Sequence, residues 1–191
     1  MTRNGESDPM DGLRSDGNGP GTSRERVFLS LGSNVGRRPD NLRKARELIR
    51  REPGIRVVGT SLLYSTSPVG YTAQRTFING VLELRTSQSP RNLLDCLERI
   101  EVRMGKSTPF RNGPRRIDID VVLYGQRQIS ECGLMVPHPR MHCRRFVLEP
   151  LAEIGARVFH PGLRRAVSRL FAGSGSDELV RPWGAWVSGG R

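Results

Sequence analysis

The stretch Arg115-Arg116-Ile117-Asp118-Ile119-Asp120-Val121-Val122-Leu123 decides how this chain is interpreted. Apolar, mostly β-branched residues alternate here with charged ones, which predicts a β-strand. Side chains two residues apart on a strand leave the same face, roughly 6.5–7 Å apart along the chain. Two ionised carboxylates held that close repel each other, so something positive should lie between Asp118 and Asp120. Mg²⁺ meets this need, because it takes one or two carboxylates together with phosphate oxygens and water.

The same spacing occurs on the polar outer face of an edge strand, and on spacing alone that interpretation is favoured. An edge strand usually mixes charges of both signs, however, which shifts the balance toward paired metal ligands. Arg115 would leave the opposite face of an ideal strand. A bend at Pro114 would let its guanidinium reach a phosphate at the preceding loop.

The composition limits the class of protein. The 191 residues, 36% of them hydrophobic, suffice for one domain with tails. We expect a cytoplasmic protein, because there is no secretory h-region, no run long enough to span a membrane, and an odd number of cysteines without a CxxC pair. A net charge of +12 favours nucleic acid, anionic membrane or phosphorylated small molecules as partners, although an arginine-rich solvated surface would give the same number.

Hydrophobic periodicity predicts the order β-α-β-β-α-β. The strands are expected at 27–31, 55–64, 77–85 and 115–124, and the helices at 39–51 and 89–104, with further short helices at 145–154 and 163–171. This order is the split ferredoxin-like arrangement. We therefore predict an α+β, ferredoxin-like sandwich with a mostly antiparallel sheet and helices on both faces. Residues 1–24 are expected to be a disordered leader, 25–172 the folded domain and 173–191 a flexible tail.

Three further patterns leave alternatives open. Glu101 lies beside the apolar stripe of the second helix and needs a partner, which is either a basic loop residue, the favoured choice, or a ligand. The Gly32-Ser33-Asn34 stretch after a strand could cradle phosphate, but alone it is more often a turn. The third pattern is a cluster of cysteines and histidines, namely Cys132, His138, His142 and Cys143. Its spacings fit no zinc site, so a phosphate-contacting loop with His138 and Arg144 is favoured.

Taken together, the motifs of residues 27–161 resemble the 6-hydroxymethyl-7,8-dihydropterin pyrophosphokinases of folate biosynthesis. The most specific part is Gly113-Pro114-Arg115 with Asp118-Ile119-Asp120, followed about twenty residues later by Pro137-His138. The remaining motifs are Leu29-Ser30-Leu31-Gly32-Ser33-Asn34, Tyr64-Ser65-Thr66-Ser67-Pro68-Val69-Gly70, Phe77-Ile78-Asn79, Arg99-Ile100-Glu101, Leu123-Tyr124-Gly125 and Val136-Pro137-His138-Pro139-Arg140-Met141.

The resemblance implies transfer of pyrophosphate from ATP to the pterin hydroxymethyl group, with release of AMP, by the domain 25–172. It implies that Asp118 and Asp120 bind two Mg²⁺ ions and that Arg115 stabilises the reacting phosphates. The implied ATP-binding residues are Glu98, Glu101, Lys106, Val121, His138 and Arg144. The implied pterin-binding residues are Thr66, Ser67, Val69, Phe77, Asn79 and Phe146. It also implies small-molecule substrates for a monomer that binds neither nucleic acid nor membrane.

The chain departs from the family pattern at a few positions. Phe77 stands where many members carry tyrosine, Asn112 where some carry an aromatic residue, and Glu98 where some carry a neutral amide. The loop from Lys106 to Asn112, which closes over the substrates in the family, has only two cations. Two other functions fit the same features: a basic nucleic-acid-binding module on a ferredoxin-like sheet, and a two-metal nuclease or nucleotidyltransferase.

Overall fold

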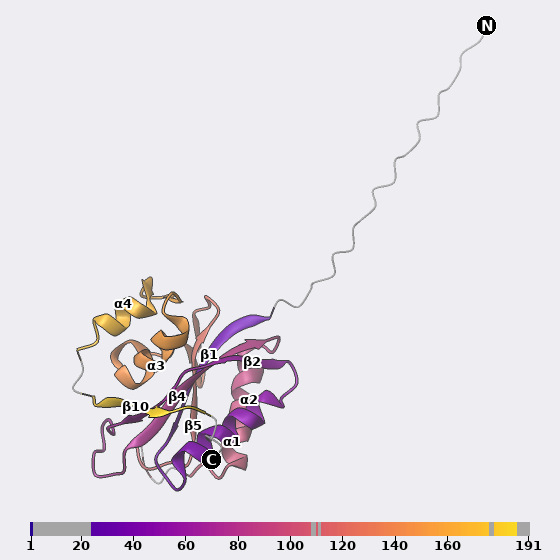
Figure 1. The fold of residues 1–191 in the computed structure, drawn as a ribbon. Coiled ribbons are helices and arrows are strands. Elements are labelled where there is room, and N and C mark those ends of the chain that lie inside the picture. The colour runs from indigo at the N-terminus through magenta and orange to yellow at the C-terminus, as the bar shows by residue number, and fades with distance from the viewer. Residues whose placement is uncertain (2–23, 108–109, 111, 176–177, 187–191) are drawn as a thin grey trace.

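The computed structural model describes residue 1 and residues 24–107, 110, 112–175 and 178–186. Most of the expected leader therefore lies outside the described residues. Within the described part, a single six-stranded sheet runs through the middle of the molecule, with helices on its two sides (Figure 1). No helix in this part is long and apolar enough to cross a membrane.

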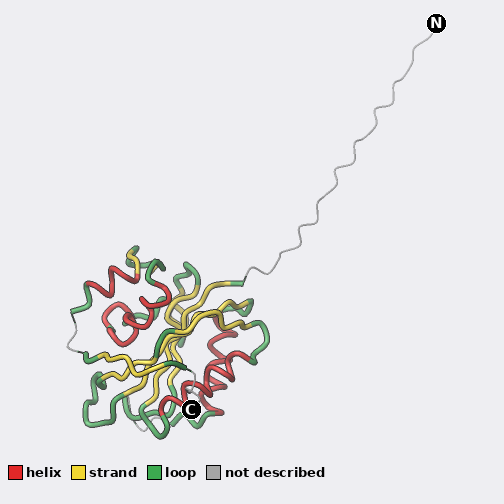
Figure 2. Tube along the Cα trace, viewed as in Figure 1, coloured by secondary structure: helices red, strands yellow, loops and turns green. Residues whose placement is uncertain are grey.

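All strand pairs of the main sheet are antiparallel, in the order β10-β3-β4-β1-β5, and β2 also pairs with β4. Figure 2 shows these strands in yellow between two groups of helices. Their bounds are β1 Glu25–Ser33, β2 Ile55–Thr60, β3 Leu63–Thr66, β4 Phe77–Thr86, β5 Asp118–Tyr124 and β10 Val180–Gly184.

Successive side chains on a strand point to opposite faces, and here both faces are covered. On β1, Val27, Leu29 and Leu31 pack in the core beneath α1 (Arg38–Arg50) and α2 (Pro90–Arg103). Phe28 points the other way, into a second core beneath α3 (Arg145–Gly155) and α4 (Val167–Ala172). This arrangement confirms the predicted α+β fold with an antiparallel sheet and helices on both faces (Figure 1).

Several elements differ from the sequence prediction, among them the strand expected at 115–124, which begins only at Asp118. The strand expected at 55–64 is split into β2 and β3 at Ser61. The Ser61 amide still donates to the Val81 carbonyl at 3.0 Å, but the Val81 amide donates to the Ser61 hydroxyl at 2.9 Å instead of to a backbone carbonyl. The helix expected at 163–171 begins only at Val167, after a short hairpin. The remaining elements are β6 Ile129–Glu131 with β7 Leu134–Val136, a 3₁₀ turn at Met141–Cys143, and β8 Phe159–His160 with β9 Arg165–Ala166.

The C-terminal segment requires a correction. A flexible tail is predicted for 173–191, yet Val180–Gly184 forms strand β10 on the edge of the main sheet, paired with β3. Trp186 is 3% exposed and belongs to the larger core. Its indole Nε1 donates to the carbonyl of Ser61 at 2.6 Å, which satisfies the polar end of the buried ring. The pairing was missed because a short stretch with Pro182 and Gly184 has no strand periodicity of its own.

Candidate active site

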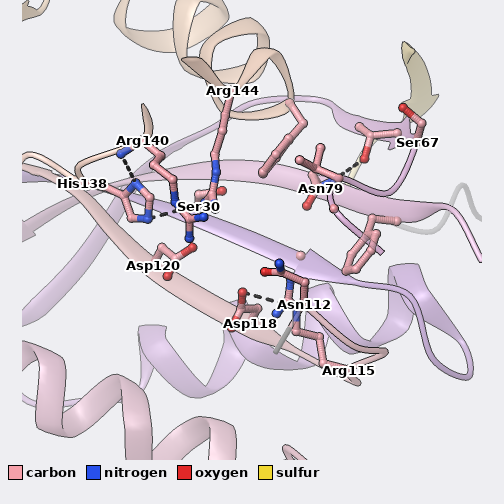
Figure 3. Close-up of a pocket in the computed structure, with 16 residues that line it drawn as sticks. Ser30, Ser67, Asn79, Asn112, Arg115, Asp118, Asp120, His138, Arg140 and Arg144 are labelled. Atoms are coloured by element: carbon pink, nitrogen blue, oxygen red, sulfur yellow. Dashed lines mark hydrogen bonds and ion pairs between the residues drawn. The ribbon is translucent and has the colours of Figure 1, made fainter. Parts of the chain in front are cut away.

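A pocket of about 250 Å³ opens on the side of the sheet that carries α3 (Figure 3). Alternate residues of β1 and β5 form its floor, and the loops after β3 and β7, together with the start of α3, form its walls. Its lining is mostly polar: Ser30, Gly32, Thr66, Ser67, Val69, Gly70, Phe77, Asn79, Asn112, Arg115, Asp118, Asp120, His138, Arg140, Arg144 and Phe146.

Asp118 and Asp120 both face this pocket, as their spacing on a strand requires. They lie opposite Gly32 and Ser30 of β1 in the strand register. Although β5 is at the end of the strand order, its carboxylates line a pocket rather than an outer face, so the edge-strand interpretation does not apply. In the part of the chain that the structure covers, no third His, Cys, Asp or Glu joins them to form a larger metal-binding group.

The two carboxylates differ in their surroundings. Asp118 lies 3.0 Å from the Lys106 ammonium and 3.4 Å from Nε of Arg115. Asp120 accepts no hydrogen bond from any residue that the structure describes. Burial and then the charge of Asp118 raise the pKa of Asp120, and Arg144 opposes this shift. Asp120 is therefore a carboxylate that an added cation would stabilise, which fits the donor set of a magnesium site.

Arg115 reaches the pocket because β5 begins only at Asp118, so the preceding residues do not follow the alternation of a strand. Asn34 holds this segment: its side-chain oxygen accepts from the Arg115 amide at 2.8 Å, and its own amide donates to the Arg115 carbonyl at 3.1 Å. The Gly-Ser-Asn stretch thus fixes the arginine loop. Apart from its 3.4 Å ion-pair contact with Asp118, the buried Nε of Arg115 has no hydrogen-bond partner among the described residues, and a buried donor of this kind favours an incoming anion.

His138, Arg140 and Arg144 stand opposite the aspartates (Figure 3). Nδ1 of His138 accepts from the Arg140 amide at 3.2 Å, and Nε2 faces Nη1 of Arg144 at 3.5 Å. Burial, followed by the charges of Arg144 and Arg140, lowers the pKa of His138 to about 4. The ring is therefore neutral at pH 7. Nothing in the sequence reasoning selected Arg140; its position two residues after His138 in the Pro-His-Pro-Arg motif is the signal that could have done so.

The other end of the pocket carries an amide and two aromatic rings. The Asn79 side-chain nitrogen donates to the Thr66 hydroxyl at 2.6 Å, which fixes the orientation of the amide. Phe77 and Phe146 line the same end. The guanidinium of Arg115 lies 5.4 Å from the Phe77 ring centroid, and that of Arg144 lies 5.4 Å from the Phe146 centroid. Each aromatic ring therefore lies between the apolar end of the pocket and an arginine of its cationic end.

Four of the residues expected at the site do not line the pocket. Glu98 is exposed on α2, and Val121 points into the core on the opposite face of β5. Glu101 is buried behind β5, where it accepts from Lys106 at 2.8 Å and from the Ile119 amide at 2.7 Å. Burial raises the pKa of Glu101 to about 7, with Lys106 opposing the shift. Lys106 reaches the site only through its contact with Asp118. The pairing favoured for Glu101 is confirmed.

The pocket also contains residues for which no role was predicted. These are Ser30 on β1, Gly70 and, in addition to Arg140, Asn112, which was noted only as a departure from the family pattern. Gly32 on β1, expected only as part of a possible phosphate cradle or a turn, also lines the pocket. The two β1 positions lie two residues apart opposite Asp120 and Asp118, so strand pairing would have identified them had the register been known. Asn112 comes from the loop before β5, and its carbonyl accepts from Gln74 at 3.0 Å.

Comparison with known proteins adds an independent observation. Residues 28–156 match the model of the 7,8-dihydro-6-hydroxymethylpterin-pyrophosphokinase (HPPK) family. The chain is 42% identical over 132 residues to a 2-amino-4-hydroxy-6-hydroxymethyldihydropteridine pyrophosphokinase of Bacillus subtilis, covering 69% of this chain and 79% of the relative. It is 39% identical over 148 residues to the protein of the same name from Pseudomonas aeruginosa, covering 78% of this chain and 91% of the relative.

The fold is similar to solved structures as well. A crystal structure of Plasmodium falciparum HPPK-DHPS superposes with a TM-score of 0.64 at 16% identity. The match covers 78% of this chain and 43% of the Plasmodium chain, so this chain spans less than half of that protein. At this identity the similarity supports the fold.

Proposed function

This chain belongs to the 7,8-dihydro-6-hydroxymethylpterin-pyrophosphokinase family, and from that premise we propose that the pocket beside Asp118 and Asp120 is where it transfers pyrophosphate from ATP to the hydroxymethyl group of 6-hydroxymethyl-7,8-dihydropterin. The observation that carries the proposal is the division of the pocket into two ends. One end combines the two carboxylates with three arginines, and the other combines an oriented amide with two aromatic rings. A polyanion and a flat heterocycle would therefore lie side by side.

At the cationic end of the pocket, the chain has more hydrogen-bond donors than the carboxylates of Asp118 and Asp120 can accept from. Arg115, Arg140 and Arg144 present guanidinium groups that suit phosphate oxygens, and the neutral ring of His138 lies beside Arg144. Asp118 and Asp120 would hold Mg²⁺, which would supply positive charge to neutralise the phosphates and lower the pKa of a bound hydroxyl. Lys106 and Arg115 already balance part of the charge of Asp118.

At the other end, Asn79 reads the heterocycle. Its nitrogen is committed to Thr66, which leaves its carbonyl oxygen to accept a hydrogen bond from a ring or amino N–H of the pterin. Phe77 and Phe146 offer faces on which the ring can stack. The pterin alcohol then lies next to the phosphate end of the pocket.

The reaction forms a bond between the substrate hydroxyl oxygen and the β-phosphorus of ATP, and breaks the bond from that phosphorus to the oxygen that leaves with AMP. The substrate alcohol is a weak nucleophile, so the chain contributes by alignment and by stabilising negative charge on the phosphates. No dedicated general base is required. We also propose that the chain acts as a cytoplasmic monomer on small molecules, as the resemblance of its sequence to the family implies.

Turnover of the intact protein tests this proposal. With ATP, Mg²⁺ and 6-hydroxymethyl-7,8-dihydropterin, AMP and a pterin diphosphate should form in equal amounts. Asp118→Ala and Asp120→Ala should each lower kcat about 100-fold or more, since each removes a charge next to the transferred group. Asp95→Ala is a matched control, because this exposed carboxylate on α2 lies outside the pocket.

Other products would contradict the proposal. Formation of ADP, or no turnover by folded protein, would exclude pyrophosphate transfer. A nucleic-acid-binding module would instead show polyanion binding that falls steeply with salt and ignores both aspartate substitutions. The measurement is titration of labelled single-stranded RNA at two salt concentrations with all three variants.

A further inference from the structure

Residues 178–186 lie outside the stretch that matches the family, yet they contact the pocket walls. Strand β10 pairs with β3, and the end of β3 delivers Thr66 and Ser67 to the pocket. In Figure 3 the end of β10 runs beside Ser67. Two residues just before β10, Glu178 and Leu179, make the contacts that matter here.

Glu178 binds the first turn of α3. Its Oε2 accepts a hydrogen bond from the Phe146 amide at 3.1 Å. The first amides of a helix lack partners within the helix, and an anion there is also favoured by the helix dipole. The sequence of α3 supplies neither a capping side chain nor a nearby negative charge. The side chain of its N-cap residue, Arg144, makes no capping bond, and its first turn contains no acidic residue. A carboxylate 32 residues further along the chain therefore caps the turn that carries Phe146.

Leu179 binds the opposite wall. The Ser67 amide donates to the Leu179 carbonyl at 3.1 Å, and the Leu179 amide donates to the Ser67 hydroxyl at 3.2 Å. Adjacent residues of the tail thus hold the two walls between which the pterin would lie. Trp186 fixes the far end of this segment in the core through its bond to Ser61.

The position of Arg144 depends less on Glu178 than the position of Phe146 does. Its amide donates to the Met141 carbonyl at 3.2 Å, and its own carbonyl accepts from the amides of Val147 and Leu148 at 3.1 and 3.0 Å. The backbone of the phosphate side is therefore held by the preceding 3₁₀ turn and by the helix. Loss of Glu178 should act mainly on Phe146.

From these contacts we propose that Glu178 is a positioning residue for the pterin end of the site, and that the segment Glu178–Leu179 bridges the wall formed by β3 to the wall formed by α3. This inference rests on the proposed function, since it assigns Phe146 and Ser67 to the pterin. It predicts an effect on the affinity for pterin that exceeds the effect on the affinity for ATP.

Steady-state kinetics of the full chain, with each substrate varied in turn, tests the inference. Glu178→Ala should raise KM for the pterin about fivefold, the ratio to which a typical helix-cap contribution corresponds, and change KM for ATP less than twofold. Glu178→Gln keeps an oxygen acceptor for the Phe146 amide and should retain most of the wild-type KM. Asp95→Ala removes an exposed carboxylate on the opposite side of the sheet and should leave both constants unchanged.

The two tryptophans of the chain, Trp183 and Trp186, both lie in the C-terminal segment 178–186, so tryptophan emission reports whether this segment is docked on the domain. Emission of Glu178→Ala should match that of the wild type. A red shift would show that the whole segment had come away, and would contradict a local role for Glu178. Equal rises in both KM values, no rise in either, or a Gln variant as impaired as the Ala variant would also overturn the inference. Inactive wild-type protein would instead overturn the proposed function itself.

Discussion

At the scale of single residues, the pterin end of the site depends on a close approach between two strands. A methyl group added to Gly32 on β1 would lie 2.5 Å from Oδ1 of Asn79 on β4, which is too close for any real contact. That oxygen is also the one left to bind a ligand, because the nitrogen of the same amide bonds Thr66. The absence of a side chain at position 32 therefore determines where the Asn79 amide can lie.

Gly32→Ala should consequently weaken pterin binding while the protein stays folded. Displacing Asn79 costs about one hydrogen bond to the ligand, so we expect KM for the pterin to rise about tenfold and KM for ATP to change little. Gly175→Ala is the control, because a methyl group there would meet no atom of the described residues within 4 Å. Equal pterin affinities for the two variants would show that Asn79 has no part in recognition.

The residues of the site illustrate how far sequence reasoning reaches. Spacing alone places Asp118 and Asp120 on one face, and the structure shows both in the pocket. The same rule puts Val121 on the opposite face, in the core, so its expected role in ATP binding has no support from the geometry. Arg140 and Ser30 were missed because their membership of the pocket depends on the path of a loop and on strand register, which one sequence does not specify.

At the scale of elements, the order β-α-β-β-α-β could be predicted because each element carries its own periodicity. The C-terminal strand could not, because its partners are far away in the sequence. Trp186 bonds Ser61, 125 residues earlier, and packs on Gly80, where an added methyl group would lie 2.7 Å from the indole. The break between β2 and β3 belongs to the same arrangement, since Ser61 accepts the indole N–H at the point where β2 ends.

Removal of this anchor should destabilise the whole domain. Trp186→Ala deletes a large buried side chain and leaves the Ser61 carbonyl without its donor, so we expect the free energy of unfolding to fall by about 3–5 kcal/mol. Trp183→Ala, at a 46% exposed position within β10, should cost less than about 1 kcal/mol. Urea denaturation followed by circular dichroism measures both. Similar losses for the two variants would mean that Trp186 does not anchor the segment.

At the scale of the whole molecule, the net charge of +12 is not simply a property of the outer surface. Arg115, Arg140 and Arg144 converge on one pocket that contains two carboxylates. Uncompensated cations in a partly buried site repel one another and any further proton. A bound polyphosphate would relieve that repulsion, so ligand affinity and protein stability should respond to pH through the same group, His138.

The sign of this response follows from the lowered pKa of His138. Burial and the neighbouring arginines lower the pKa to about 4, whereas an unfolded histidine titrates near its ordinary value of about 6.5. As pH falls through this interval, the unfolded chain takes up a proton that the folded chain refuses, so unfolding becomes easier. The stability that neutral His138 contributes is present above pH 6.5 and is lost progressively toward pH 4.

Comparison with His138→Gln isolates this contribution, because all other titrating groups are common to the two proteins. Between pH 7.5 and 4.5, the wild type should lose about 1–2 kcal/mol more of its free energy of unfolding than the variant, after allowance for solvent screening at a half-buried ring. Urea denaturation at intervals of half a pH unit measures the difference. Inorganic triphosphate should make the wild-type curve shallower, because its negative charge offsets Arg140 and Arg144 and allows the ring to accept a proton. Parallel curves for the two proteins without triphosphate would show that His138 titrates normally and that the arginines do not act on it.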